Sequence, residues 1–180
     1  MEEDGPVNRL PGVVQPAGAS SVTVERAGPD DFPPIAELTV RVYVDGGLAS
    51  PGYAPELADV AGRATRAQLL VARDPGGRVV GSVALVLGSD FANTARSDDE
   101  AEIRMLVVDP SVQERGLGEL LVTTCLDRAR TAGRTRMVLS TDLRMAAAIR
   151  LYERLGFTRL PERDWAPEPG IDLIAYGRGL

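Results

Sequence analysis

Hydrophobic and polar positions change their spacing several times along this 180-residue chain, and each change predicts an element. Alternating or short apolar runs are typical of strands and occur at 22–26, 69–73, 78–87, 102–108, 135–140 and 171–176. Apolar residues at helical spacing predict helices at 30–43, 55–68, 116–132 and 145–155. The polar segments 46–55, 88–99 and 158–169 are expected to be irregular.

The order of these elements indicates the fold class. Residues 74–77, Asp-Pro-Gly-Gly, separate two predicted strands and favour a hairpin. From residue 69 onward strands and helices alternate, which predicts an α/β (α+β) fold with a mixed sheet. Residues 1–20 hold three prolines and three glycines without periodicity, so we expect a flexible N-terminal arm followed by a single domain over 21–180.

The composition of the chain excludes several classes of function and of site. The chain is 44% hydrophobic, typical of a globular protein, and its net charge of −6 argues against nucleic acid as a partner. The absence of histidine excludes Ser-His-Asp hydrolysis and histidine-based zinc sites. The single cysteine, Cys125, excludes an internal disulfide. No metal site is predicted. No apolar run reaches the length of a membrane span, and the acidic start is unlike a signal peptide. We therefore expect a cytoplasmic protein with no membrane partner.

Two glycines, Gly116 and Gly118, stand at the predicted start of the 116–132 helix, where glycine costs stability. A helix start exposes unpaired N–H groups with partial positive charge, and glycine lets an anion approach them. Gln113–Gly118 therefore predicts a phosphate cradle, to which Arg115 would add charge. The alternative is a turn that lets strand and helix pack closely. A dinucleotide fingerprint would need a third glycine where Leu121 stands, and a P-loop would need Gly-Lys-Ser/Thr.

Two motifs in register resemble the GCN5-related N-acetyltransferase (GNAT) superfamily. Gln113-Glu-Arg-Gly-Leu-Gly118 is similar to its Arg/Gln-x-x-Gly-x-Gly/Ala signature, and Ala148-Ile-Arg-Leu-Tyr-Glu-Arg-Leu-Gly-Phe157 to Ala-x-x-Leu-Tyr-x-x-x-Gly-Phe. The resemblance spans about residues 22–178. It implies a mixed, mostly antiparallel central sheet of six to seven strands flanked by about four helices. Within that sheet it implies a splayed parallel pair formed by 102–108 and 135–140.

The resemblance also implies acetyl-coenzyme A (acetyl-CoA), with its pyrophosphate on the amides of 114–119 and its pantetheine arm along 106–108. It assigns to the cofactor Leu106, Val107, Val108, Gln113, Glu114, Arg115, Gly116, Leu117, Gly118, Glu119 and Met145. Two of these depart from the family pattern. Met145 stands where the family often has Asn and cannot copy the hydrogen bonds of an amide. Glu114 stands where many relatives have a small residue, and its carboxylate would repel a pyrophosphate unless it points to solvent.

Acyl transfer from a thioester to an amine needs a base, an oxyanion donor and an acid for the leaving thiolate. The resemblance implies Tyr152 as the acid and a backbone N–H near Val107 or Val108 as the oxyanion donor. Glu102 is the candidate base, because some family members carry a catalytic glutamate at this offset, eleven residues before Gln113. Strand alternation would place it beside Arg104, opposite Ile103, Met105 and Val107. The alternative is a structural acid that anchors a loop.

The predicted function is acetyl transfer from acetyl-CoA to the primary amine of a small molecule or peptide. Cys125 is expected to be a buried thiol, which favours direct transfer in a ternary complex over an acyl-enzyme. Acceptor specificity is expected from residues 43–53 and from the 158–170 segment, where Trp165 either fills the core edge or lines the acceptor pocket. Whether the protein is a homodimer stays open. The alternative function is a non-catalytic acyl-CoA-binding sensor on the same fold.

Overall fold

The computed structural model describes residues 22–113 and 116–180. The predicted N-terminal arm over 1–20 lies outside the described residues, as do Glu114 and Arg115 of the predicted phosphate cradle. The single domain predicted for 21–180 stays a prediction. Among the residues that the structure describes, no helix is both long enough and apolar enough to cross a membrane.

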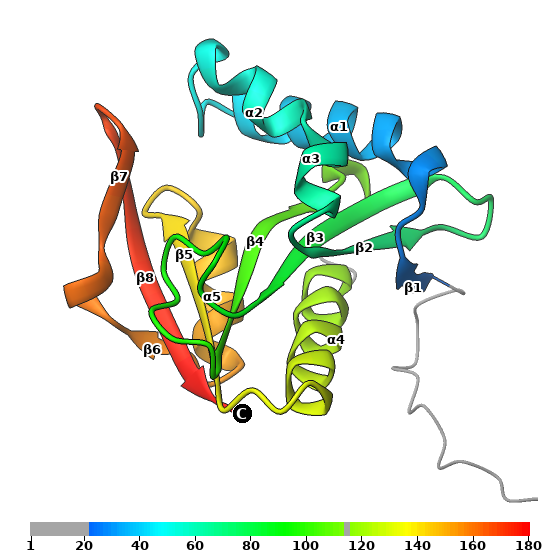
Figure 1. Cartoon of the computed structure of the whole chain (residues 1–180). Coiled ribbons are helices and arrows are strands. Elements are labelled where there is room, and N and C mark those ends of the chain that lie inside the picture. The colour runs from blue at the N-terminus through cyan, green and yellow to red at the C-terminus, as the bar shows by residue number, and fades with distance from the viewer. Residues whose placement is uncertain (1–21, 114–115) are drawn as a thin grey trace, which may run out of the picture.

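A single mixed sheet forms the centre of the described chain (Figure 1). Its strands are β1 (Thr23–Arg26), β2 (Gln68–Arg73), β3 (Val79–Leu87), β4 (Glu100–Val108), β5 (Arg136–Asp142), β6 (Thr158–Arg159), β7 (Trp165–Glu168) and β8 (Ile171–Gly179). They lie in the order β1-β2-β3-β4-β5-β8-β6, and β7 pairs with β8. All pairs are antiparallel except β4–β5. The predicted mixed, mostly antiparallel sheet is confirmed, with the short β6 and β7 added to the expected strands.

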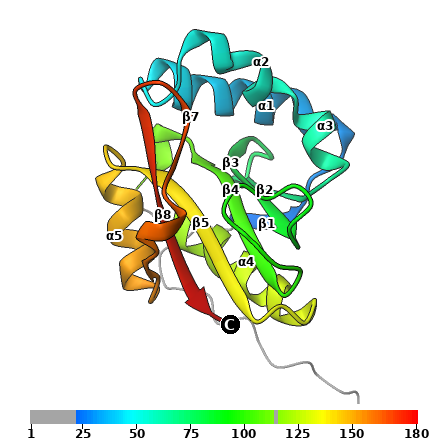
Figure 2. The same ribbon diagram turned by 60° about the vertical axis from the view of Figure 1, so that its left-hand side comes forward.

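Helices cover both faces of this sheet (Figure 2). They are α1 (Phe32–Val40), α2 (Ala54–Ala58), α3 (Val60–Ala64), α4 (Leu117–Thr131) and α5 (Ala146–Arg154). On one face, Ile35 and Leu38 of α1 pack with Val60 of α3 against β2 and β3. On the other face, Leu121 and Cys125 of α4 belong to the larger core together with Tyr152 of α5. The sheet therefore separates two apolar cores.

The parallel strands β4 and β5 pair over only part of their length. The pairing runs from Glu100↔Arg136 to Ile103↔Leu139 and stops there, although β4 continues to Val108 and β5 to Asp142. Beyond Ile103 the edge of β4 that faces β5 pairs with no strand of the described residues, so its backbone groups are available to a ligand. This arrangement confirms the splayed pair that the family resemblance implies.

A β-bulge lies at the point where these strands part. Ala84 of β3 pairs with Arg104, and Ser82 pairs with Val107, so β4 carries one extra residue here. Met105 adopts the left-handed conformation, with φ +48°. The extra residue reverses the side-chain alternation: Ile103 belongs to the core under α4, whereas Val107 packs in the core under α1. Our expectation that Ile103 and Val107 share a face was wrong, because simple alternation does not continue through a bulge.

Three other predicted elements differ in detail from those in the structure. The predicted 55–68 helix is divided at Asp59, whose ψ of 65° is not helical and whose side chain caps α3 by accepting from Gly62 N–H. The first helix continues past Val40 as a π-helical turn over Arg41–Asp45. The 158–169 segment, expected to be irregular, contains β6 and β7.

Candidate active site

The start of α4 exposes main-chain N–H groups. Gly116 is the N-cap residue with φ +76°, which glycine adopts without strain, and none of the described side chains caps this end. Intrahelical bonding begins with Leu120 N–H, which donates to Gly116 O at 3.0 Å. The preceding amides, of Leu117, Gly118 and Glu119, therefore have no intrahelical acceptor. Apart from its chain neighbours, a Cβ on Gly116 would meet no described atom within 4 Å, so this position of the turn is open.

Gly118 has a packing role as well. A Cβ at this position would lie 3.2 Å from Leu151 Cδ2 on α5 and 4.0 Å from Val108 Cγ2 on β4. Glycine here allows α4 to approach both elements closely. Of the two explanations considered for the glycine pair, close packing thus applies to Gly118, whereas Gly116 provides an open, positively polarised turn suited to an anion.

A groove runs from this turn to the gap between β4 and β5, and we call it the donor groove. Its walls include residues 106–108 of β4, Gln113, residues 116–119 of α4, and the α5 side with Met145 and Leu151. Its rim is charged, because Arg144, Arg150 and Arg154 line it together with Glu119. Glu119 Oε2 pairs with Arg154 Nη2 at 3.1 Å across the groove. The described residues assigned to the cofactor from sequence therefore lie around one groove.

A second cavity, which we call the acceptor cavity, has an empty volume of about 850 Å³ that includes open solvent space. Its aromatic lining is Tyr43, Tyr53, Tyr152 and Trp165, and its polar lining includes Glu102 and Arg104. Both segments expected to set acceptor specificity, 43–53 and 158–170, contribute to its wall. Trp165 also has a structural role, because its indole N–H donates to Ser140 Oγ at 3.2 Å.

The donor groove and the acceptor cavity meet. Four residues line both of them: Leu48, Leu106, Met145 and Tyr152. Leu106 directly follows the bulge in β4, and Met145 is the N-cap residue of α5, where its sulfur accepts a hydrogen bond from Thr141 Oγ1 at 3.6 Å. The junction therefore lies at the gap where the parallel strands part.

Glu102 is a buried carboxylate whose two oxygens make different contacts. Its Oε2 accepts backbone N–H donors from Asn93, Thr94 and Ala95 at 3.0, 2.7 and 2.9 Å, and these contacts hold the 88–99 loop against β4. Its Oε1 lies 3.9 Å from Arg104 Nε. Burial raises the pKa of Glu102, although the three N–H donors and the charge of Arg104 oppose that shift. The carboxylate of this cavity-lining residue therefore anchors a loop through Oε2, and among the described residues no hydrogen bond is made to Oε1.

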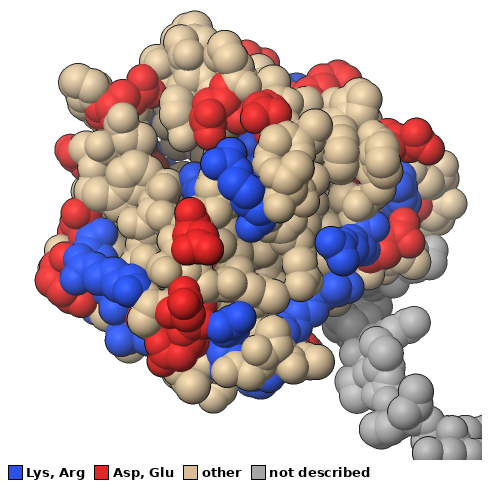
Figure 3. Space-filling view, viewed as in Figure 1, with Lys and Arg blue, Asp and Glu red and all other residues tan. Residues whose placement is uncertain are grey.

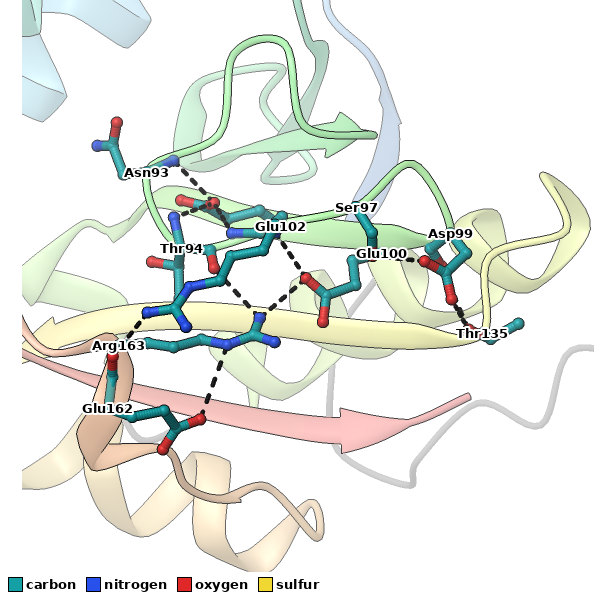
Figure 4. A network of polar contacts seen from close by, with 11 residues as sticks. Asn93, Thr94, Ser97, Asp99, Glu100, Glu102, Thr135, Glu162 and Arg163 are labelled. Atoms are coloured by element: carbon teal, nitrogen blue, oxygen red, sulfur yellow. Dashed lines mark hydrogen bonds and ion pairs between the residues drawn. The ribbon is translucent and has the colours of Figure 1, made fainter.

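The loop held by Glu102 is secured at a second point (Figure 4). Glu100 Oε2 accepts Arg96 N–H and pairs with Arg163 Nη1, both at 2.8 Å, and Arg163 also donates to Thr94 O at 3.2 Å. Figure 4 shows the Asn93 side chain pointing away from the Glu102 carboxylate that its backbone N–H faces. Two acids on β4 therefore fix the loop from which Asn93 lines the acceptor cavity.

Tyr152 lies at the junction of the two cavities. The residue is 4% exposed, and its ring packs edge-on against Phe157 with the centroids 5.8 Å apart. Burial raises the pKa of its hydroxyl, with smaller contributions from Tyr43 and Cys125, so the group stays protonated at neutral pH. Tyr43 is similar: burial raises its pKa to about 12, and its hydroxyl donates to Leu106 O at 3.4 Å.

Sequence reasoning missed several acceptor-cavity residues. Arg104 was noted only as a neighbour of Glu102, yet its side chain is 9% exposed and lines the cavity. Its two-residue spacing from Glu102 was the available signal. Asn93 and Glu168 also line the cavity but come from a loop and from β7, and no local motif marks them.

Basic and acidic side chains lie interspersed over the face shown in Figure 3. All 20 basic residues of the chain are arginines, since the sequence contains no lysine. The α-amino group is therefore the only primary amine that the chain itself offers for acetylation.

Comparison with known proteins agrees with this geometry. The model of the acetyltransferase (GNAT) family matches residues 34–157. Glucosamine 6-phosphate N-acetyltransferase of Trypanosoma brucei brucei is 29% identical over 138 residues, which cover 68% of this chain and 90% of the relative. The [ribosomal protein bS18]-alanine N-acetyltransferase of Salmonella typhimurium is 43% identical over 67 residues, which cover 37% of this chain and only 45% of the relative.

Solved structures show the same fold. YncA of Salmonella typhimurium, determined with its cofactor acetyl-CoA, superposes with a TM-score of 0.65 at 25% identity, covering 89% of this chain and 95% of that one. The chain therefore belongs to the acetyltransferase (GNAT) family, and it is an N-acetyltransferase with acetyl-CoA as its donor.

Proposed function

We propose that the protein transfers the acetyl group directly from acetyl-CoA to the primary amine of a second substrate bound beside it. The observation that carries this proposal is the junction of the donor groove and the acceptor cavity at Leu106, Met145 and Tyr152. Two substrates that entered from the two sides would meet in the gap between β4 and β5. Holding both reactants in one site removes much of the entropic barrier to a bimolecular reaction.

The donor groove fits a long ligand with a diphosphate at one end. The amides of Leu117–Glu119, which lack an acceptor within α4, would hold the diphosphate, and the edge of β4 beyond Ile103, unpaired among the described residues, would hold the amides of the pantetheine arm. Acetyl-CoA supplies the activated acetyl thioester. Met145 would contact the arm through its apolar side chain, so the hydrogen bonds that an Asn would make here are absent.

Glu102 would act as the base. Glu102 lines the acceptor cavity, its Oε1 accepts no hydrogen bond from the described residues, and burial raises the pKa of the carboxyl, which makes the carboxylate a better proton acceptor. It would take a proton from the acceptor's ammonium, directly or through a water. The neutral amine then forms the new C–N bond while the thioester C–S bond breaks. The three N–H donors on Oε2 keep the carboxylate in place throughout.

Tyr152 would serve as the acid at the sulfur. Its hydroxyl is protonated at neutral pH and would donate a hydrogen bond, and finally its proton, to the departing thiolate. The second proton, which the acceptor nitrogen loses as the amide forms, would return to this hydroxyl. Because its pKa is raised above that of a thiol, the hydrogen bond itself supplies most of the stabilisation. A backbone N–H of β4 near Val107 would stabilise the oxyanion.

A covalent acetyl-enzyme has little support. Cys125 is fully buried within α4, and burial raises its pKa to about 12, so its thiolate is scarce at neutral pH. A chain without lysine makes this easy to test, because intact-protein mass spectrometry after incubation with acetyl-CoA alone would reveal an acetyl adduct. We expect none beyond the N-terminus.

The defining experiment is incubation with acetyl-CoA and a panel of primary amines, with release of the coenzyme A thiol as the readout. We expect steady turnover with at least one amine and only background release without one. Coenzyme A binding in calorimetry combined with no turnover across the panel would favour the acyl-CoA sensor instead.

A further inference from the structure

The Arg104 guanidinium has unused hydrogen-bonding capacity in the acceptor cavity. Its side chain is 91% buried, yet its one hydrogen bond to a described residue is from Nη1 to Phe91 O, at 2.7 Å, while the Phe91 ring lies 4.5 Å from its Cζ. Its only ion pair among the described residues is the 3.9 Å contact with Glu102 Oε1. A guanidinium has five N–H donors, and no Arg104 nitrogen is among the fully buried atoms without a partner, so its remaining donors are open to solvent or to a ligand. Arg104 is therefore prepared to bind an anion.

Glu102 does not act as the anion that Arg104 would bind. Its Oε2 is occupied by three backbone N–H groups, and its Oε1 remains 3.9 Å from Arg104 Nε. Two opposite charges thus stand side by side at the cavity wall without a close hydrogen bond between them. In an α-amino acid the ammonium nitrogen and a carboxylate oxygen are separated by roughly 3 Å, from standard bond lengths. A zwitterion of this size complements the pair.

From these contacts we infer that the acceptor is an α-amino acid with an apolar side chain. Its carboxylate binds Arg104 and its amine faces Glu102. This inference rests on the proposed function, which supplies the amine acetylation. The remainder of the cavity suits an apolar group, since Tyr53, Leu57, Trp165 and Leu173 line it.

A phosphate-bearing acceptor fits less well. Besides Arg104, the charged residues lining the acceptor cavity are the acids Glu102, Asp142 and Glu168. Asp142 pairs with Arg144 at 2.6 Å, and Glu168 accepts from Ser50 N–H and Oγ, so both stay ionised: hydrogen bonds from these partners lower the pKa of each. Arg144 compensates the charge of Asp142, but Glu102 and Glu168 would repel a dianion, whereas one guanidinium holds one carboxylate in a bidentate pair.

The test compares each amino acid with its own amide. Leucine, methionine, phenylalanine and tryptophan are assayed by coenzyme A release beside the corresponding amino acid amides, glucosamine 6-phosphate and a peptide with N-terminal alanine. For at least one of these amino acids, we expect kcat/KM to be on the order of 100-fold higher than for its amide, because the amide leaves Arg104 without an anion. An amino acid amide has the less basic amine, so chemical reactivity alone would favour the amide.

Two substitutions test whether Arg104 causes the preference for the amino acid over its amide. Arg104→Gln should reduce the ratio of acid to amide to about one. Arg66→Gln is the matched control, since Arg66 stacks on the same Phe91 ring at 4.0 Å but does not line the cavity, and it should keep the ratio. If Arg104→Gln fails to fold, the ratio of acid to amide measured on the unaltered protein still shows whether the acceptor is an α-amino acid.

Equal rates for acid and amide, or a preference for the peptide or for glucosamine 6-phosphate, would overturn this inference while leaving the proposed function standing. Absence of turnover with every amine would overturn the proposed function itself.

Discussion

The donor groove and the acceptor cavity meet at four residues but are built in different ways. The donor groove is formed mainly by one continuous stretch, from the bulge in β4 through the start of α4, and by the facing side of α5. Its chemistry is largely that of the main chain: amides at a glycine-rich helix start and an unpaired strand edge. The acceptor cavity is formed by side chains from segments as far apart as Tyr43 and Leu173.

This difference indicates how each site responds to change. A site made of backbone groups tolerates side-chain substitution except where a side chain would fill the space, so its sensitive positions are glycines. A site made of side chains can lose one interaction at a time, and its specificity can change without altering the fold. Substitutions on the two sides should therefore affect different quantities, coenzyme affinity on one side and turnover or acceptor choice on the other.

The largest effect is expected from Glu102→Gln. A glutamine oxygen can still accept the three loop N–H donors, but it cannot take a proton, so turnover should fall on the order of 1000-fold. The deficit should be greatest at low pH, where the amine is protonated, and should shrink as pH rises. The assay is kcat against pH, with coenzyme A affinity measured by calorimetry.

The variant Glu102→Ala separates the two roles of this residue. It removes the loop anchor as well as the base, so it should lower the melting temperature, which Glu102→Gln should leave nearly unchanged. Full activity of Glu102→Gln across the pH range would exclude Glu102 as the base and leave it as an anchor only.

Gly118→Glu should act on the donor side. The new side chain would collide with Leu151 and place a second carboxylate beside Glu119, so coenzyme A should bind about 100-fold more weakly. Calorimetric titration with coenzyme A measures the effect. Thr131→Glu adds the same charge at the far end of α4 and should keep the affinity. Unchanged affinity in Gly118→Glu would refute the placement of the diphosphate.

Tyr152→Phe should have a smaller effect on rate. The ring and its packing on Phe157 remain, and only the hydroxyl at the junction is lost, so kcat should fall about tenfold while coenzyme affinity changes little. Stopped assays with acetyl-CoA at saturation measure kcat. Activity equal to that of the parent protein would remove the acid role of Tyr152.

The smallest effect concerns the loop anchor at Glu100. Burial raises its pKa, but hydrogen bonds from Arg163 and the Arg96 N–H outweigh that effect, and the pKa is lowered from 4.5. Such a carboxylate stabilises the fold above its unfolded pKa and loses this contribution as pH falls through its folded pKa. Glu100→Gln should therefore cost about 1 kcal/mol at pH 7. The difference should narrow below pH 4.5; a cost that stayed constant down to pH 3 would contradict this account.

The donor groove could be predicted from the sequence because its residues lie in short continuous stretches of the chain. The glycine pair and the tyrosine motif each occupy a short stretch, and the parting of β4 from β5 followed from the resemblance that these motifs carry. The bulge at Met105 was not visible, because nothing in the 102–108 run distinguishes an extra residue from regular alternation. The acceptor cavity was predicted only as two segments, since Arg104, Asn93 and Glu168 meet through tertiary packing alone.

The decisive measurement for the donor groove is a crystal structure of the protein with coenzyme A bound. We expect the diphosphate against the main-chain N–H groups of residues 117–119, and the pantetheine arm along residues 106–108 with its sulfur near the Tyr152 hydroxyl. Coenzyme A bound elsewhere, or a diphosphate held by side chains with the start of α4 empty, would contradict this placement.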